Sequence, residues 1–221
     1  MQSIRLWAQP LWVNLLIFVP FLAFYFWRRK PLEISAARLA CSAGFALAFG
    51  FVEGSVVVYL RGALGMLPGI GGTLADVARL SSSAYQQAYS IDQFPRSLTT
   101  VETVREGATM IMLLSVAALA GRRWRERWAM FLWMFALWDI LYYVSLRAMT
   151  GWPVSLTDLD VLFLIPVPWV AQVWFPLLVS GLTAAAVLGG SLLSRMIPGS
   201  SPLGDVPVGE SAGFFNRLRE E

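Results

Sequence analysis

The chain has 221 residues, of which 57% are hydrophobic and only 14% are charged, and its mean hydropathy is +0.61. This balance excludes an ordinary water-soluble globular domain and predicts a protein built into a membrane. The formal net charge is +3, but the basic residues flank apolar stretches. We therefore interpret them as signals of membrane orientation and expect no nucleic-acid partner.

Several apolar stretches are long enough to cross about 30 Å of hydrocarbon, which takes about 20 helical residues. In chain order, the predicted transmembrane helices are residues 10–27, 36–60, 101–120, 128–146 and 168–193. The first runs into Trp27-Arg28-Arg29-Lys30 without a small-residue cleavage site, which favours a retained span over a signal peptide. The fold class predicted is therefore all-α, a polytopic bundle of five transmembrane helices.

Two connections between these helices are not simple hairpins. The connection 62–100 is long, and after the glycine-rich residues 69–72 the stretch 74–80 predicts a short interfacial helix. The stretch 160–166 is apolar, too short to span, and followed closely by a second proline. It predicts a short re-entrant or interfacial segment packed against the bundle.

The basic residues predict the orientation of the bundle. Most of the 17 lysine and arginine residues fall on the side that carries the clusters at 28–30 and 122–127. Cytoplasmic loops carry such an excess, so we expect the N-terminus outside and the C-terminus in the cytoplasm. Residues 1–197 are expected to form one transmembrane domain. Residues 198–221, rich in glycine, proline, serine and charge, are expected to form a flexible cytoplasmic tail.

Carboxylates interrupt two of the apolar stretches, Glu53 in the second helix and Asp139 in the fourth. An ionised carboxylate in hydrocarbon costs at least about 2.5 kcal/mol, so such a residue marks a polar site with a partner. Arg61 and Arg147 each follow eight positions later. At 1.5 Å per helical residue, both acids should lie about 12 Å below their arginines and at about the same depth.

Further polar residues should share this outer half of the membrane. The third helix enters from the outer side with two acids and an arginine in its first turns, and two acids, Asp158 and Asp160, precede the fifth helix. Two tyrosines follow Asp139 at spacings that place them near its helix face. The candidate ligand- or ion-binding residues are Glu53, Arg61, Glu102, Arg105, Glu106, Asp139, Tyr142, Tyr143, Arg147 and Asp160.

These residues allow three interpretations. Glu53 could pair with Arg105, and Asp139 with Arg147 or Tyr142, purely to dock helices in a medium without water. The acids could instead line a path or site for a proton, ion or small solute. Because the chain has no histidine, carboxylates alone would favour a hard cation such as Mg²⁺, Mn²⁺ or Ca²⁺, held by Glu53, Glu106 and Asp139. No cofactor can be assigned from the sequence.

The third interpretation is a membrane-embedded enzyme. Glu53 or Asp139 would then act as general acid on a lipid or isoprenoid-like substrate. Rhomboid-type serine chemistry and CAAX-type proteolysis both need histidine, which the chain lacks. The residues therefore name no enzyme class.

Four segments together resemble a family of uncharacterised bacterial multi-pass integral membrane proteins. They are FVEGSVVVYLR (51–61), WDILYY (138–143), GWP (151–153) and DVLFLIPVPW (160–169). The similarity covers most of residues 47–180 and implies the bacterial inner membrane, without an activity. We therefore expect a non-catalytic accessory subunit or a small-solute or cation-binding protein. Its partners would be the lipid bilayer and either another membrane protein or further copies of itself.

Overall fold

The computed structural model describes residues 7–30, 32–63 and 96–196, with only the backbone described at 60–63, 96–98 and 194–196. In these ranges five helical stretches are long and apolar enough to cross a membrane, which confirms the predicted helical fold class. They are η1 with α1 (Leu11–Phe18 and Val19–Arg29), α2 (Ala36–Ala63), α4 (Arg96–Ala120), α5 (Trp124–Thr150) and α6 (Trp174–Met196). The interfacial helix predicted at 74–80 and the tail 198–221 lie outside the described residues.

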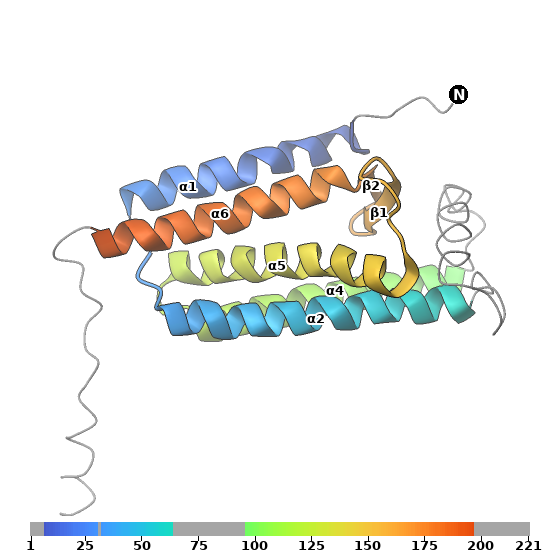
Figure 1. The fold of residues 1–221 in the computed structure, drawn as a ribbon, viewed down its shortest axis with the longest axis horizontal. Helices are drawn as coiled ribbons and strands as arrows, with labels where there is room; N and C mark the ends of the chain where they lie inside the picture. Colours follow the sequence, from blue (N-terminus) through green and yellow to red (C-terminus); the bar gives the residue numbers. More distant parts are fainter. Residues whose placement is uncertain (1–6, 31, 64–95, 197–221) are drawn as a thin grey trace, which may run out of the picture.

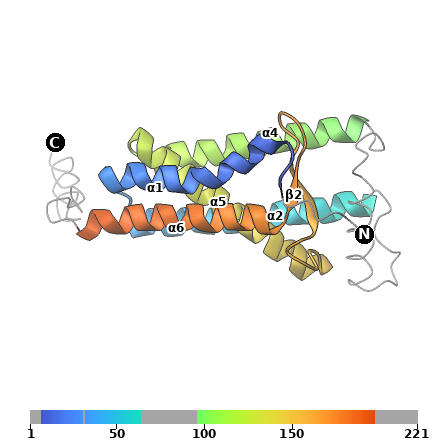
Figure 2. The same cartoon turned by 90° about the horizontal axis from the view of Figure 1, so that it is seen from above.

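Helix α5 is the centre of the bundle, because it packs against α2, α4 and α6. Helix α1 packs against α6, and the two run side by side above α5, while α2 and α4 lie below it (Figure 1). Consecutive helices alternate in direction along the long axis of the molecule, as Figure 2 also shows. The first helix therefore begins, and the last helix ends, at opposite ends of the bundle.

The closest helix contact lies between α2 and α5, where small residues of α2 allow the backbones to approach. A Cβ atom on Gly50 would lie 2.7 Å from the carbonyl oxygen of Trp138. One on Gly54 would lie 3.3 Å from the Cβ of Ser145, and Ala46 is fully buried. This ladder of small residues holds the part of α2 that carries Glu53 close to the central helix.

The turn between α4 and α5 is held by a buried acid. The carboxylate of Glu126 accepts hydrogen bonds from the backbone N–H groups of Arg122 (3.0 Å) and Arg123 (3.3 Å) at the start of α5. At the other end, α5 stops at Gly151, whose φ of 75° is the left-handed conformation typical of a helix C-cap. These two caps fix the length of the helix that carries Asp139.

The stretch predicted as a re-entrant or interfacial segment is extended. Strands β1 (Leu159–Phe163) and β2 (Trp169–Gln172) form an antiparallel hairpin, and a bridge from Gln9 to Val170 adds the N-terminal segment to it. The predicted start of the last span at residue 168 is therefore wrong, since α6 begins at Trp174. Antiparallel pairing satisfies the backbone groups of an apolar stretch that is too short to cross as a helix.

The orientation of the bundle stays a prediction and can be tested by protease access. The protein is expressed in a bacterial host with a protease-sensitive tag after Glu221. We expect this tag to survive protease in spheroplasts and to be digested in inverted vesicles. A tag placed before Met1 should show the reverse pattern and serves as the control. Digestion of the C-terminal tag in spheroplasts would reverse the assigned orientation and move the site described next to the cytoplasmic half.

Candidate functional site

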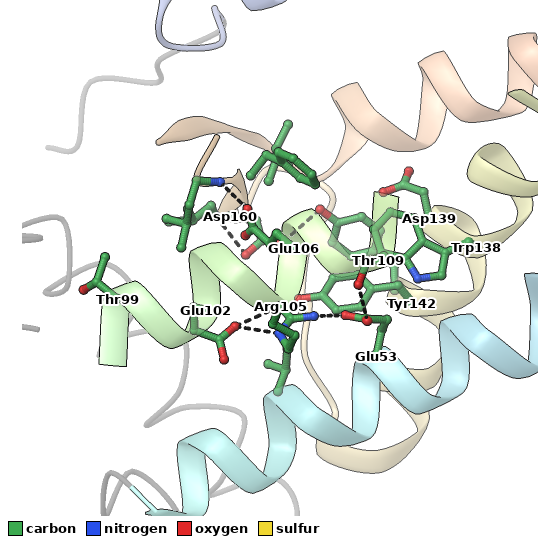
Figure 3. Close-up of a pocket in the computed structure, with 16 residues that line it drawn as sticks. Glu53, Thr99, Glu102, Arg105, Glu106, Thr109, Trp138, Asp139, Tyr142 and Asp160 are labelled. Atoms are coloured by element: carbon green, nitrogen blue, oxygen red, sulfur yellow. Dashed lines mark hydrogen bonds and ion pairs between the residues drawn. The ribbon is translucent and has the colours of Figure 1, made fainter. Parts of the chain in front are cut away.

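A cavity of about 120 Å³ lies between α2, α4, α5 and β1, at the end of the bundle that carries the hairpin (Figure 3). Of the candidate residues whose side chains are described, all except Arg147 line it. The complete lining is Glu53, Val57, Thr99, Glu102, Arg105, Glu106, Thr109, Trp138, Asp139, Tyr142, Tyr143, Asp160, Val161, Leu162, Phe163 and Leu164. The convergence of acids expected from helix depth is therefore present.

The predicted pair of Glu53 and Arg105 is formed, and it connects α2 to α4. One oxygen of Glu53 contacts the Arg105 guanidinium, and the other accepts a hydrogen bond from the Thr109 hydroxyl at 2.8 Å. The side chain of Glu53 is only 7% exposed. Arg105 also donates to Glu102 from Nε and Nη2, both at 2.8 Å. Figure 3 shows Glu53, Arg105 and Thr109 facing one another between the two helices. This arginine thus neutralises acids on both sides of it.

Glu106 connects α4 to the hairpin. Its Oε2 accepts a hydrogen bond from the backbone N–H of Leu164 at 2.8 Å, just after strand β1 ends. Glu102 and Glu106 lie one helical turn apart, where like charges repel unless a cation or an arginine such as Arg105 neutralises them. In the structure, Arg105 contacts both Glu102 and Glu53, while Glu106 accepts a hydrogen bond from a backbone N–H.

The remaining acids lie on α5 and β1. Asp139 accepts a hydrogen bond from the hydroxyl of Ser180 on α6 at 2.8 Å. Asp160, which is buried, accepts one from the Tyr143 hydroxyl at 2.9 Å and one from the N–H of Val161 at 3.0 Å. These three donors, a serine hydroxyl, a tyrosine hydroxyl and a backbone N–H, are all neutral groups.

Arg147, one of the candidate residues, does not line the cavity. Arg147 donates to the carbonyl oxygens of Gly151 and Pro153, the latter at 2.7 Å, and so holds the end of α5. The suggested pair of Asp139 with Arg147 is therefore wrong, because the partners of this arginine are carbonyls that follow the end of α5. Arg61 lies in α2, and its side chain is outside the described residues.

The metal interpretation gains no support from the geometry. Glu53, Glu106 and Asp139 line one cavity, yet the described residues contain no group of three acids, cysteines or histidines placed to hold a metal ion. Each of the three carboxylates instead has its own protein donor. A hard divalent cation takes six or more oxygen ligands, which these separate positions do not provide.

Several residues of the site were not selected from the sequence. Thr109 and Ser180 supply hydroxyl donors to Glu53 and Asp139, and residues 161–164 supply an apolar wall. The hydroxyl of a helical threonine or serine usually donates to a backbone carbonyl of its own helix. The sequence around Thr109 and Ser180 therefore does not indicate a partner on another helix. Trp138 also lines the cavity, and its indole N–H has no acceptor among the described residues.

The site combines an excess of acids with an apolar surface. Its lining holds the carboxylates of Glu53, Glu102, Glu106, Asp139 and Asp160, while the lining residues include one arginine and no other basic side chain. Aromatic and aliphatic side chains complete the wall. Such a lining suits a small ligand that is positively charged on one side and apolar on the other.

Comparison of the chain with protein-family models, with curated proteins and with solved structures finds no match.

Proposed function

We propose that this chain is a multi-pass protein of the bacterial inner membrane that binds a small cationic solute in the cavity between α2, α4, α5 and the hairpin. The observation that carries the proposal is the charge of the lining, where the described acids outnumber the only arginine. The five apolar helices support the membrane setting. The bacterial location and the family rest on the sequence resemblance.

The distribution of partners indicates which acids a ligand would meet. Arg105 is already shared between Glu53 and Glu102. Glu106 and Asp139 are held by neutral donors, a backbone N–H and a serine hydroxyl. A carboxylate at membrane depth is stabilised by a counter-charge, and a cationic solute between α4 and α5 would supply it. The cavity would then function by placing that solute against Glu106 and Asp139.

The enzyme alternative is less well supported by the geometry. Both oxygens of Glu53 already contact groups of the protein, Arg105 and Thr109, so this residue has no unengaged oxygen to present to a substrate. Asp139 lines the cavity, but one of its oxygens already accepts a hydrogen bond from Ser180. Binding needs only the charge and shape that are present.

Thermal unfolding with added ligands tests the proposal. Purified protein in detergent should gain stability saturably with a small cation, by about 2.7 kcal/mol at a concentration one hundred times the dissociation constant. Asp139→Asn retains an oxygen for Ser180 and should lose most of that gain. Stabilisation that is absent for every cation, at constant ionic strength, would refute the proposal.

A matched control is available at the opposite end of the bundle. Glu33 pairs with Arg123 (2.6 Å) and Arg125 (3.6 Å) near the turn between α4 and α5, far along the helices from the hairpin. Glu33→Gln removes one negative charge without touching the cavity. It should leave the ligand-dependent stabilisation unchanged, and an equal loss in Glu33→Gln and Asp139→Asn would show that net charge alone is responsible.

A further inference from the structure

We infer that the turn between α4 and α5 binds the headgroup of an anionic phospholipid from the surrounding bilayer. The phosphate of the lipid would lie against Arg122 and Arg127, and the upper part of its acyl chains against Trp124 and Trp128. This turn is at the end of the bundle opposite the cavity (Figure 1). The inference requires the membrane setting of the five apolar helices and is independent of what the cavity binds.

The end of the bundle that contains this turn carries an excess of positive charge. Arg123 on the turn pairs with Glu33 in the connection between α1 and α2, so the basic residues of both segments lie at this end. The described basic residues there are Arg28, Arg29, Lys30, Arg38, Arg122, Arg123, Arg125 and Arg127. The described acids there are engaged, since Glu33 contacts Arg123 and Arg125 and Glu126 is only 2% exposed. Anionic headgroups are complementary to such a surface.

Two arginines of the turn keep hydrogen-bond donors for a ligand. Arg122 and Arg127 are both exposed. Among the described residues, no acceptor contacts the side chain of Arg122. Arg127 uses only its Nε, which donates to the carbonyl oxygen of Gly121 at 3.2 Å, and this contact holds its side chain next to the residue that precedes Arg122. A guanidinium has five N–H donors and matches the geometry of a phosphate group.

The turn is ordered by contacts within the protein. The buried carboxylate of Glu126 accepts hydrogen bonds from the backbone N–H groups of Arg122 and Arg123. A Cβ atom on Gly121 would lie 2.5 Å from the backbone nitrogen of Arg127, so only glycine permits this close approach. The positions of the arginine backbones are therefore fixed before a ligand arrives, which reduces the ordering cost of binding.

Two exposed tryptophans favour a lipid over a free anion. Trp124 and Trp128 are one helical turn apart on α5, and their rings meet edge to face with centroids 5.7 Å apart. Their exposed fractions are 70% and 43%. Indole rings are enriched at the level of the headgroups, where the ring meets acyl chains and the N–H meets polar groups. A soluble phosphate would gain nothing from these rings, whereas a phospholipid contacts them and the arginines together.

Quenching of tryptophan fluorescence tests the inference on the full chain in a neutral detergent. The protein is titrated with phosphatidylglycerol whose acyl chains carry bromine, which quenches on contact, and with brominated phosphatidylcholine as the reference without net charge. We expect additional, saturable quenching by phosphatidylglycerol. This additional quenching should disappear at about 1 M salt, where the Debye length is about 3 Å. Equal quenching by the two lipids at low salt would overturn the inference.

Tryptophan variants locate the bound lipid. Trp124→Phe combined with Trp128→Phe should remove most of the additional quenching, because the nearest fluorophores are gone. Trp7 and Trp12 are also exposed, at 68% and 43%, but lie at the hairpin end of the bundle. Replacing both of these with phenylalanine should leave the additional quenching in place. Loss of the additional quenching only in this second double variant would place the lipid at the hairpin end and refute the assigned site.

Charge variants separate a defined site from general attraction to the basic end. Arg122→Gln should weaken the affinity for phosphatidylglycerol roughly fivefold, and Arg127→Gln should add a similar factor. Arg28→Gln with Lys30→Gln removes the same charge from the end of α1. It should weaken the affinity by less than about twofold, because charges outside the contact are screened. Equal losses in the two double variants would overturn the assigned site. If Arg127→Gln fails to fold, Arg122→Gln alone decides the question.

Inorganic phosphate distinguishes the lipid headgroup from a free anion. Added in large excess over the lipid at constant ionic strength, it should leave the additional quenching by phosphatidylglycerol unchanged, because it cannot contact the tryptophans in the same way. Displacement of the lipid by inorganic phosphate would show that the arginines recognise a soluble anion and would overturn the bilayer lipid as the occupant.

Discussion

Replacing Arg105 with methionine is expected to lower the free energy of unfolding by about 3 kcal/mol, because it leaves Glu53 without its cation. Glu53 is 7% exposed, while the Arg105 side chain is 25% exposed. The expected cost is therefore at the lower end of the range for breaking a buried pair. Methionine retains much of the length and packing of the arginine stem. Unfolding followed by circular dichroism during titration with a denaturing detergent would measure the effect.

Removing the charge of Glu53 should cost less stability than removing the charge of Arg105. Glu53→Gln removes the buried charge but leaves Arg105 in contact with Glu102, at 2.8 Å from Nη2. We therefore expect it to cost only about 1 kcal/mol, the scale of one hydrogen bond. Adding Glu53→Gln to Arg105→Met should recover most of the loss, since no charge is then stranded. A double variant as unstable as Arg105→Met would show that packing of the arginine, and not its charge, holds α2 to α4.

An exposed pair at the other end of the bundle provides the control. Arg123 and Glu33 are 54% and 36% exposed at their side chains, with an N–O distance of 2.6 Å. Arg123→Met should cost less than about 1 kcal/mol, because water and screening weaken such pairs. If Arg123→Met and Arg105→Met had equal effects, the buried pair would have no special role in stability.

The sequence predicts the position of this site because the bilayer allows few alternatives. Glu53 and Asp139 interrupt long apolar runs, and a charge at that depth must face protein. Helix rise then places both acids in the same half of the membrane, and the cavity does contain them both. In the structure, Gly50 and Gly54 lie on the face of α2 that meets α5. Length, hydropathy and the cost of burial therefore account for the bundle and for most of the lining.

The partners of individual side chains could not be predicted in the same way. Arg147 and Asp139 share a helical face at a spacing of two turns, yet Arg147 bonds to carbonyls at the end of its own helix. Asp139 instead accepts a hydrogen bond from Ser180 on α6. Helix periodicity fixes which residues share a face, but the choice among nearby donors depends on helix contacts of long sequence separation. The hairpin was missed for a different reason: residues 161–165 form a short continuous apolar run, and the periodicity of such a run does not distinguish a strand from a buried helical segment.

Replacing Gly50 with alanine is expected to destabilise the bundle by about 1–3 kcal/mol, the cost of overpacking a close contact. The added Cβ would lie 2.7 Å from the carbonyl oxygen of Trp138 and 3.2 Å from the Cβ of Leu141. The first of these atoms belongs to the backbone of α5, so it cannot move aside like the end of a flexible side chain. Relief would require α2 and α5 to separate.

The same substitution at Gly44 is the matched control, because both glycines lie within α2. A Cβ atom on Gly44 would meet nothing within 4 Å, so Gly44→Ala should be neutral or stabilising by up to about 1 kcal/mol through helix propensity. Separation of α2 from α5 would also move Glu53 relative to Asp139. Gly50→Ala should therefore weaken binding in the cavity as well as lowering stability. Equal stability of Gly50→Ala and Gly44→Ala would mean that α2 can move away from α5 without cost, and the cavity between them would then not be a rigid binding site.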